Sequence, residues 1–499
     1  MDYKNRPLAL VILVILILTA VSFIKVDKKV LGLDIKTVDI YADLKPKKEV
    51  IKEEIEEDDF FKPKYETEKD DFFKPQYDLN DTSESSSIVE ENESLIYTAS
   101  IIDYERLVER TTEFFASDNF SNSNSSILQN LQNVPIVGNV NQLKPFFDAL
   151  KSADKSQVRI AHFGDSLIEG DLISADVRET MQKEFGGKGV GYLPITSQDV
   201  NFRITTKISF SNNWETASIF GSNPNRLEYG INGEVFVPKG NSWVEYELYR
   251  KYRNAREFTK ARVFYANAKA SSIEYSINGK KSEKATLSGG RGLQELVIDA
   301  GGSANKLKLE FPEREQAHVY GVSLENGNGV YVDNFPFRGN SGIDLQQINV
   351  SMLKDFARKL DYKLIILEFG LNASSTASRD FGWYEREMLK VIDNLKQAFP
   401  RTGILLIGVQ DKSVKKGTKF ETDPKVLKLL EAQKNIAKSA NIAFWSLFDA
   451  MGGENSMPQW VDANPPLAFK DYVHFNGQGA AKVADMLSEA LITAYKKLR

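Results

Sequence analysis

The sequence predicts an α/β fold, in which a parallel sheet is covered by helices on both faces and is interrupted by an all-β insertion. The first observation is a series of short apolar runs, each followed by a segment with helical spacing, which is typical of strands buried on both faces. The second is a stretch of about 115 residues in which hydrophobic and polar residues alternate, as in antiparallel sheets. The length of 499 residues allows two or more domains.

The chain starts with a candidate membrane segment. Residues 8–24 are apolar except for one Thr and one Ser, and they follow Lys4 and Arg6. This length is at the short end of what spans a bilayer as a helix. A cleaved signal peptide is the alternative. We favour an uncleaved transmembrane helix, which makes residues 1–30 an N-terminal membrane anchor.

Residues 31–100 are predicted to form an acidic, disordered linker. Residues 51–100 contain 16 Asp and Glu against 5 Lys, a net charge of −11, whereas the whole chain carries −5. A segment with so much charge and so few aliphatic side chains cannot bury enough surface to fold. Within it, residues 58–65 recur almost unchanged as residues 70–77. This 58–77 repeat is either an expanded spacer or a docking peptide whose paired phenylalanines bind an envelope protein.

Residues 101–200 are predicted to form the first part of the α/β domain. Their central feature is an apolar strand over residues 158–164, followed at once by Asp165 and Ser166. Residues 167–185 have helical spacing and end at two glycines. A serine at such a strand-to-helix corner is presented at the edge of a sheet, where it can act as a nucleophile.

Residues 201–317 are predicted to form an inserted β-sandwich. The polar and apolar residues alternate here, and Asn278-Gly279 is a strong hairpin signal. Because an α/β pattern flanks this stretch on both sides, we interpret it as an insertion. Its aromatic side chains either form a platform for a sugar ring or fill the core of the sandwich. The aromatic residues in question are Trp214, Tyr229, Trp243, Tyr246, Tyr249 and Tyr265.

Residues 318–499 are predicted to complete the α/β domain. Buried strands that alternate with helices form a parallel sheet covered on both faces. Strands are expected over residues 319–324, 329–333, 364–369, 403–409 and 442–447. Helices are expected over residues 343–360, 384–399, 425–439 and 479–499.

The composition excludes several kinds of chemistry. The absence of Cys excludes disulfides, thiolate nucleophiles and cysteine–metal sites. No group of His and carboxylates has metal-ligand spacing, so we expect no metal and no cofactor. The net charge of −5 gives no general attraction to nucleic acid. The chemistry that remains is that of an activated serine.

A serine hydroxyl needs a base, and the chain has only three histidines. His162 lies within the strand before Ser166, and His318 lies where the β insertion ends. His474 lies in a polar loop before the final helix, three residues after Asp471. A carboxylate at this spacing can accept the Nδ1 proton and leave Nε2 as the base. By itself, the spacing equally fits a loop histidine capped by a neighbouring carboxylate.

Two loops offer hydrogen-bond donors for an oxyanion. One is residues 337–342 (Phe-Arg-Gly-Asn-Ser-Gly), and the other is residues 369–372 (Phe-Gly-Leu-Asn), which follow a buried strand. A glycine lets a backbone N–H approach a substrate closely, and an Asn side chain supplies a further donor. Ligands of open parallel sheets bind at such strand ends. Each loop taken alone is also explained as a simple turn.

In their order along the chain, Gly-Asp-Ser-Leu, the Gly loop, Gly-x-Asn and Asp-x-x-His resemble the SGNH (GDSL-type) hydrolase family. The resemblance implies a three-layer, flavodoxin-like parallel sheet. It also implies Ser166 as nucleophile, His474 as general base and acid, and Asp471 as the carboxylate that orients His474. The implied oxyanion hole consists of the Ser166 N–H, the Gly339 N–H and the Asn372 side chain.

A closer resemblance is to the bacterial peptidoglycan O-acetylesterases. Residues 164–171, 187–192 and 444–453 carry it, together with the inserted sandwich, which is similar to a carbohydrate-binding module. One departure from the wider family is Ala373, at a position where Asp is common. The resemblance implies an O-acetylated cell-wall polysaccharide as substrate. With the anchor, it implies attachment to the bacterial inner membrane and a catalytic body in the periplasm.

Four further residues are candidate substrate-binding groups. Asp165 and Gly370 lie within the motifs themselves. Arg338, beside the Gly loop, would steady an anionic group or pair with an acid. Asp411 follows the apolar run that ends at Val409 and is expected at the rim.

The sequence leaves three functions open. The favoured one is a serine esterase that removes O-acetyl groups from a cell-envelope glycan, foremost peptidoglycan, through an acyl-Ser166 intermediate. An O-acetyltransferase would use the same acyl-enzyme with a sugar hydroxyl in place of water. A catalytically inactive glycan-binding protein is the third, and the intact set of Ser166, His474 and Asp471 argues against it.

Overall fold

The structure, a computed structural model, describes residues 29–30, 33–34, 133–196, 202–221, 223–376 and 380–498. The chain divides into two compact units, Met1–Phe114 and Phe115–Arg499. In the first, β1 (Lys29–Val30) pairs with β2 (Leu33–Asp34). The apolar run and the 58–77 repeat lie outside the described residues, so the anchor and the docking peptide stay predictions. Within the described part of the chain, no helix is long and apolar enough to cross a membrane.

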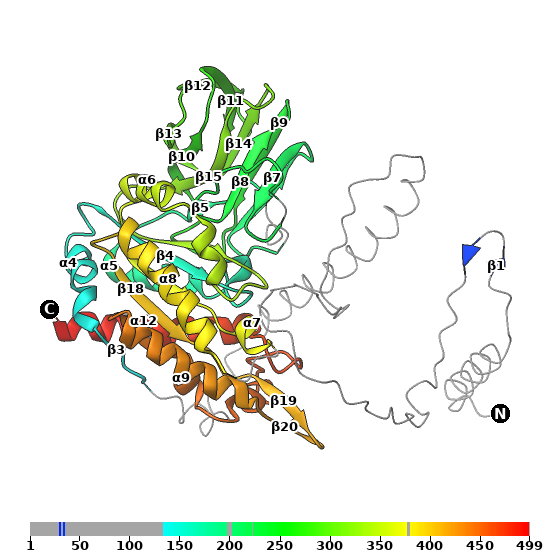
Figure 1. Cartoon of the computed structure of the whole chain (residues 1–499). Coiled ribbons are helices and arrows are strands. Elements are labelled where there is room, and N and C mark those ends of the chain that lie inside the picture. Colours follow the sequence, from blue (N-terminus) through cyan, green and yellow to red (C-terminus); the bar gives the residue numbers. More distant parts are fainter. Residues whose placement is uncertain are drawn as a thin grey trace, which may run out of the picture. The chain divides into compact units, whose positions relative to one another are not determined.

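The second unit is built on a central sheet of six strands (Figure 1). They are β3 (Val137–Gly138), β4 (Gln157–Gly164), β16 (Gly329–Pro336), β17 (Tyr362–Glu368), β18 (Gly403–Gly408) and β21 (Ala443–Ser446). Their spatial order is β16-β4-β17-β18-β21-β3, with only β3 antiparallel to its neighbour. Numbered along the chain, the parallel strands have the order 2-1-3-4-5 of flavodoxin-like folds.

Helices cover both faces of this sheet, as the sequence predicts (Figure 1). One face carries α4 (Lys144–Leu150), α5 (Ser174–Phe185) and α12 (Gly477–Leu498), and the other carries α6 (Val350–Leu360), α8 (Gly382–Ala398) and α9 (Pro424–Ser439). Successive residues of β17 enter different cores: Leu364 and Ile366 pack with the first group of helices, Ile365 and Leu367 with the second. Because both faces are buried, the strand sequences do not alternate.

Two predicted helices begin later than their spacing indicates. After Ser166 the chain first makes a 3-10 turn, η4 (Glu169–Asp171), with Gly170 at φ +68°, and α5 starts only at Ser174. Likewise a 3-10 turn, η6 (Ile343–Gln347), precedes α6. The described residues also form the short helices η3 (Val140–Leu143), α7 (Leu371–Ser374), α10 (Leu447–Met451) and α11 (Ser456–Val461).

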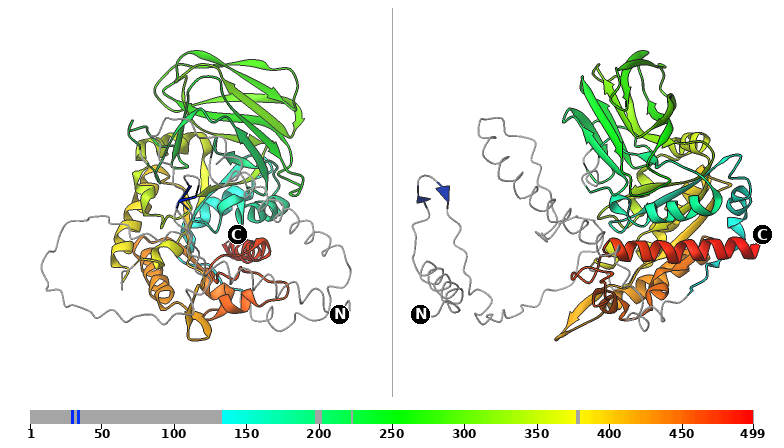
Figure 2. Two further views of the ribbon diagram at one scale, coloured as in Figure 1. Left: turned by 90° about the vertical axis from the view of Figure 1, so that its right-hand side faces the viewer. Right: turned by 180° about the vertical axis from the view of Figure 1, so that it is seen from behind.

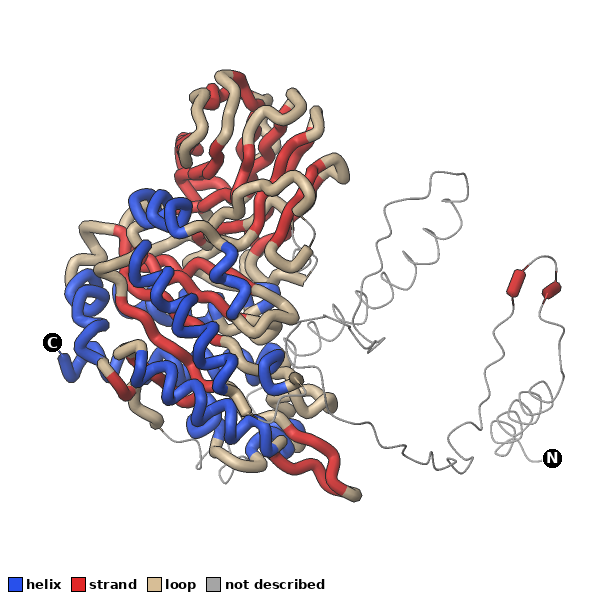
Figure 3. Tube along the Cα trace, viewed as in Figure 1, coloured by secondary structure: helices blue, strands red, loops and turns tan. Residues whose placement is uncertain are grey.

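The alternating stretch forms two antiparallel sheets that share one core, which makes a sandwich (Figures 2 and 3). One sheet consists of β12 (Glu283–Leu287), β11 (Ser271–Ile277), β14 (Lys306–Phe311), β9 (Ser242–Leu248) and β6 (Thr206–Phe210). The other consists of β13 (Gln294–Ala304), β10 (Phe258–Ala266), β15 (His318–Glu325), β8 (Glu234–Pro238) and β7 (Trp214–Ser218), with β5 (Gly191–Leu193) paired to β15.

The sequence pattern places the strand over residues 319–324 in the α/β domain, and this prediction is wrong. The strand is β15, which pairs antiparallel with β10 and β5 in the sandwich. It resembles a strand of the parallel sheet because it is buried on both sides. Val322 lies in the sandwich core, whereas Tyr320 packs against Phe356 of α6 with ring centroids 5.7 Å apart. A non-alternating strand therefore marks two-sided burial and not the type of sheet.

Most aromatic residues of the insertion fill its core. Tyr246 and Tyr265 are buried, and the Trp214 ring packs edge-on against Phe311 with centroids 5.3 Å apart. Of the six aromatic residues considered for sugar binding, only Tyr249 is well exposed, at 43%. The burial of Tyr246 and Tyr265 favours the predicted alternative, in which aromatic side chains fill the core of the sandwich.

Candidate active site

The nucleophile corner forms where β4 ends. The Asp165 N–H donates to the Glu368 carbonyl of β17 at 3.2 Å, and the Phe337 N–H, just after β16, donates to the Gly164 carbonyl at 2.7 Å. A Cβ on Gly164 would lie 2.9 Å from the Glu368 oxygen, so this close approach requires glycine. The corner lies where β4 and β17 meet, at the switch point of the doubly wound sheet.

Ser166, His474 and Asp471 form a chain of hydrogen bonds. Ser166 Oγ lies 3.1 Å from His474 Nε2, and His474 Nδ1 lies 2.8 Å from Asp471 Oδ2. Asp471 Oδ1 accepts the N–H groups of Val473 at 2.9 Å and His474 at 3.0 Å. These contacts fix the carboxylate against Nδ1 and leave Nε2 to take a proton from Ser166. The His474 side chain is 38% exposed, so the pair is accessible from solvent.

The Asp471 carboxylate is held in its ionised form. Burial by itself would raise its pKa, but hydrogen bonds from the His474 ring and from the N–H groups of His474 and Val473 outweigh this effect and lower the pKa. An ionised carboxylate stabilises the positive charge that develops on the ring when His474 accepts a proton.

Packing fixes the loop that carries His474. The Phe469 N–H donates to the His474 carbonyl at 2.9 Å, and the Ser413 N–H donates to the Tyr472 carbonyl at 3.1 Å. Tyr472 has φ +59°, a left-handed conformation that is unfavourable for an aromatic residue. The Phe420 ring stacks on the Tyr472 ring with centroids 3.7 Å apart. The neighbouring segment thus holds the loop in a conformation that it would not adopt alone.

The two other predicted oxyanion donors lie on loops that follow β16 and β17, the two strands that flank β4. Gly339 is exposed and has φ +76°, which explains the glycine. Asn372, in α7, donates from Nδ2 to the Asn340 carbonyl at 2.9 Å and so joins the two loops. An amide nitrogen has two hydrogens, so Asn372 Nδ2 can donate a second hydrogen bond.

The start of α7 is supported without the Asp that is common in the SGNH family. Ala373, at that position, is buried. The Ser374 hydroxyl donates to the Leu371 carbonyl at 2.7 Å, and Lys412 Nζ lies 3.2 Å from the same hydroxyl oxygen. A Cβ on Gly370 would lie 2.7 Å from Val409 Cβ. Gly370 is buried, and its lack of a side chain permits tight packing of the strand ends.

Two carboxylates predicted as substrate-binding groups are fully buried. Asp165 Oδ1 accepts the Leu167 N–H at 3.1 Å, and burial raises the pKa of this carboxyl to about 7. Asp411 accepts the Met457 N–H and the Thr422 hydroxyl, each at 2.8 Å. Asp411 is thus not at the rim: both carboxylates support loops from within.

Arg338 is the last of the predicted site residues, and His318 is one of the two histidines that were not chosen as the base. Arg338 is 45% exposed beside Gly339, and its guanidinium pairs with Glu169 at 3.2 Å. Of the two predicted roles for Arg338, binding a substrate anion or pairing with an acidic side chain, the structure shows the second. His318 lies on the insertion with Nδ1 3.2 Å from Asn267 Nδ2, and burial lowers its pKa. His318 belongs to the sandwich sheet and does not pair with Ser166.

A buried polar cluster beneath the corner is not evident from the sequence. His162 Nε2 lies 2.8 Å from Glu368 Oε2, and its Nδ1 lies 3.0 Å from Ser174 Oγ. Asn334 donates from Nδ2 to the same Ser174 oxygen at 2.9 Å. All four side chains are buried, and they join β4, β16 and β17 to the start of α5. The only sequence signal is a histidine inside an apolar strand, which does not identify its partners.

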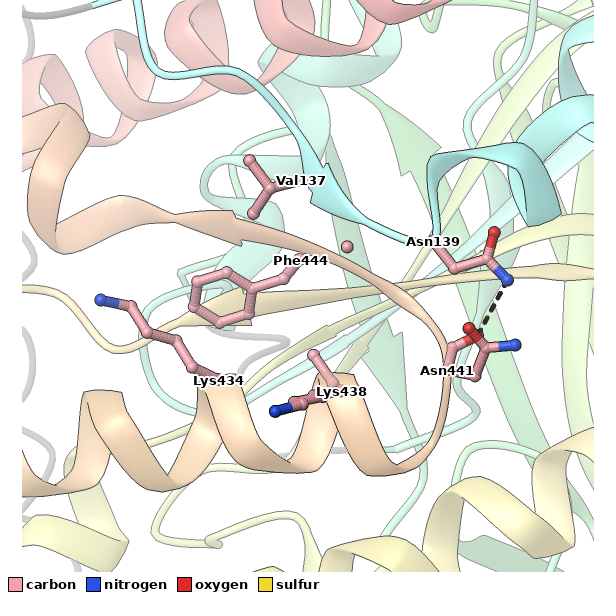
Figure 4. A pocket seen from close by; sticks show the side chains of 8 residues that line it. Val137, Asn139, Lys434, Lys438, Asn441 and Phe444 are labelled. Atoms are coloured by element: carbon pink, nitrogen blue, oxygen red, sulfur yellow. Dashed lines mark hydrogen bonds between the residues drawn. The ribbon is translucent and has the colours of Figure 1, made fainter.

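We also searched the described residues for potential metal ligands and for cavities. Within the described ranges, no group of three or more His, Cys, Asp or Glu side chains could hold a metal ion. A cavity of about 480 Å³ lies at the β21–β3 edge of the sheet, beside α9 (Figure 4). Lys434, Lys438 and Phe444 are among its lining residues, and no predicted site residue is among them.

The unit is therefore a doubly wound α/β protein with a Ser–His–Asp hydrogen-bonded chain at its switch point. No family model and no curated protein matches the chain. Among solved structures, it is similar to a peptidoglycan O-acetylesterase, with 22% identity and a TM-score of 0.60 over 73% of this chain and 100% of that chain. The predicted resemblance is confirmed for the fold.

Two carbohydrate esterases are also similar, with low overall scores. An acetyl xylan esterase has 20% identity and a TM-score of 0.25 over 32% of this chain and 80% of its own. A family two carbohydrate esterase from Cellvibrio japonicus has 9% identity and a TM-score of 0.24 over 59% of this chain and 99% of its own.

Proposed function

We propose that this protein is a serine esterase that removes O-acetyl groups from a cell-envelope glycan, with peptidoglycan as the first candidate. The observation that carries the proposal is the contact of Ser166 Oγ with His474 Nε2 at 3.1 Å, with Asp471 on the other ring nitrogen. This arrangement fits nucleophilic acyl transfer. The shared fold with a peptidoglycan O-acetylesterase supports the choice of substrate.

In the proposed reaction, Ser166 Oγ attacks the acetyl carbonyl carbon while its proton passes to His474 Nε2. The bond between that carbon and the sugar oxygen then breaks, and His474 gives the proton to the sugar oxygen. Water next attacks the acyl-Ser166 carbonyl and loses a proton to His474. Acetate leaves, and Ser166 regains its proton. In both acylation and deacylation, the backbone N–H groups of Ser166 and Gly339 and the side-chain amide of Asn372 would stabilise the oxyanion.

The N-terminal sequence supports a location outside the cytoplasm. An anchor over residues 1–30 and a linker over residues 31–100 would let the body reach a polymer at some distance from the membrane. Fractionation of cells that produce the full chain tests this location, and we expect the protein in the inner-membrane fraction. We also expect that added protease cleaves the protein only after the outer membrane has been permeabilised.

Acetate release by the purified full chain tests the activity. We expect turnover of an aryl acetate and of O-acetylated cell-wall fragments, and none above background with Ser166→Ala. Adding a soluble sugar acceptor separates an esterase from a transferase, because only a transferase would convert acetate release into acetylated sugar. Wild-type turnover equal to that of Ser166→Ala would favour a glycan-binding protein instead.

A further inference from the structure

The turn that follows Ser166 has a strained backbone that the proposed chemistry does not explain. Gly170 and Asp171 both have φ +68°, and Ile173 has φ +58°. Left-handed angles suit glycine but are unfavourable for a β-branched residue such as isoleucine. Such conformations persist only where the surrounding structure fixes them, and they cluster at functional sites. Specific contacts must therefore hold this turn, and they converge on Asp171.

The Asp171 carboxylate is fully buried between three side chains. Arg178 donates from Nη1 to Oδ2 at 2.8 Å and from Nη2 to Oδ1 at 2.9 Å. The Thr205 hydroxyl donates to Oδ2 at 2.6 Å, and Arg203 Nη2 lies 3.6 Å from the same oxygen. Burial by itself would raise the pKa of Asp171, but the charges of Arg178 and Arg203 outweigh this effect and lower the pKa. The carboxylate is therefore held in its ionised form.

Two of these partners come from the start of the inserted sandwich. Arg203 and Thr205 lie directly before β6. Between them, the Ile204 N–H donates to the Gly170 carbonyl at 2.9 Å. The insertion thus holds the turn at two successive residues, through a backbone contact at Gly170 and through side chains at Asp171.

The same turn also contacts the elements that carry the proposed oxyanion donors. Glu169, within the turn, pairs at 3.2 Å with Arg338, which directly precedes Gly339. The Asn334 side chain of β16 donates to the Ile168 carbonyl at 2.9 Å. A displacement of the turn would therefore act on both the nucleophile corner and the oxyanion loop.

We propose that Asp171 is a positioning residue, through which the insertion holds the turn after Ser166 in the form that the proposed reaction needs. The inference rests on the proposed esterase function, and it gives the insertion a part in acyl transfer itself, apart from any binding of glycan. A displaced Ser166 Oγ would be poorly aligned with His474 Nε2 and with the acyl carbonyl. Small displacements of reacting groups cost large factors in rate.

The test removes the insertion's side-chain contacts to Asp171 in the full-length protein. The double variant Arg203→Met, Thr205→Val does this, while Arg178 still pairs with the carboxylate. We expect kcat on an aryl acetate to fall about tenfold with KM unchanged. An aryl acetate carries no glycan, so weaker glycan binding by the insertion cannot cause this loss. Thr205→Val alone removes no charge and should show a smaller loss in kcat, which keeps the test decisive if the double variant does not fold.

A matched control makes the same kinds of change around another buried carboxylate of the insertion. In the variant Arg262→Met, Ser323→Ala, Glu325 loses a guanidinium at 3.2 Å and a hydroxyl at 2.8 Å but keeps its pair with Arg159 at 2.6 Å. Arg159 lies near the start of β4, whereas Ser166 follows its end. The control variant should therefore lose stability but keep the wild-type kcat.

Covalent labelling of Ser166 separates a positioning role from a merely structural one. With a sulfonyl fluoride, the serine Oγ forms a bond to sulfur, the sulfur–fluorine bond breaks, and fluoride and the hydroxyl proton leave. The final extent of labelling counts the folded molecules, and the rate constant reports how well each one places Oγ against His474. A positioning role lowers the rate constant at full extent, whereas partial unfolding lowers the extent.

A wild-type kcat and a wild-type labelling rate in the double variant would overturn the inference, and so would an equal loss in the control variant. A wild-type protein that is labelled but releases no acetate would overturn the proposed function alone, and the labelling rates would still decide the inference. A wild-type protein that does neither would overturn both.

Discussion

Ser166 and His474 are 308 positions apart in the sequence, and their Oγ and Nε2 atoms lie 3.1 Å apart. Ser166 follows β4, which lies inside the central sheet, whereas His474 belongs to a loop just before α12. The loop reaches the serine because Ser413 and Phe420, from the segment after β18, hold Tyr472 by a hydrogen bond and by ring stacking. The position of the proposed base thus depends on packing between three distant parts of the chain.

Replacing His474 by Ala should lower kcat on an aryl acetate by about 10⁴-fold or more, because among the described residues His474 is the base within hydrogen-bond distance of Ser166 Oγ. Initial rates over a range of substrate concentrations would measure this loss. His318→Ala is the matched control and should keep activity, since His318 lies on the insertion. Comparable losses in both variants would indicate a general structural effect.

Asp471→Asn should reduce kcat by about 10²- to 10⁴-fold, less than the loss of Ser166 or His474. The hydrogen bonds that lower the pKa of Asp471 keep it ionised, so the variant removes a charge that stabilises the protonated ring. Steady-state kinetics near neutral pH would show the effect. Full activity in this variant would mean that another group orients His474.

Asn372→Ala should lower kcat by about 10²- to 10³-fold with little change in KM, which is the pattern for a donor that acts mainly on the oxyanion. The side chain also holds the Asn340 carbonyl, so a thermal unfolding curve must accompany the kinetics. Asn435→Ala, at an exposed position on α9, is the control. A rise in KM alone would assign Asn372 to ground-state binding instead.

Asp165→Asn should flatten the pH dependence of stability. In the folded protein the pKa of Asp165 is about 7, whereas in an unfolded chain an Asp pKa is about 3.9. Between these values the folded state holds a proton that the unfolded state releases, so raising the pH lowers the free energy of unfolding, by up to about 4 kcal/mol. Denaturant unfolding at pH 4.5, 6 and 7.5 measures the slope. An identical slope in wild type and variant would contradict the predicted proton uptake.

The His162–Glu368 pair should contribute a measurable coupling energy to stability. His162→Leu leaves a buried carboxyl group without its partner and should cost about 3 kcal/mol. The double variant His162→Leu, Glu368→Leu should be less destabilised than the sum of the single variants, by about 1–3 kcal/mol. Denaturant unfolding of all four proteins completes the cycle. Additive effects would mean that the two groups do not interact.

The short-range features of this protein are determined by the sequence itself. The apolar runs that become β4, β17 and β18, and the glycine-bounded corner at Ser166, follow from local spacing and local backbone preferences. The candidate residues Ser166, His474 and Asp471 were likewise identified from motifs. These patterns extend over only a few residues, and the strands β4, β17 and β18 form where the patterns predict them.

Only the tertiary structure decides which distant groups meet. It assigns β15 to the sandwich, buries Asp411, pairs Arg338 with Glu169 and sets His162 against Glu368. Periodicity shows that a strand is buried on both faces, but not which elements cover it. Long-range partners depend on packing and charge across the whole unit, and this is why the depth and the neighbours of each polar group could not be predicted from the sequence.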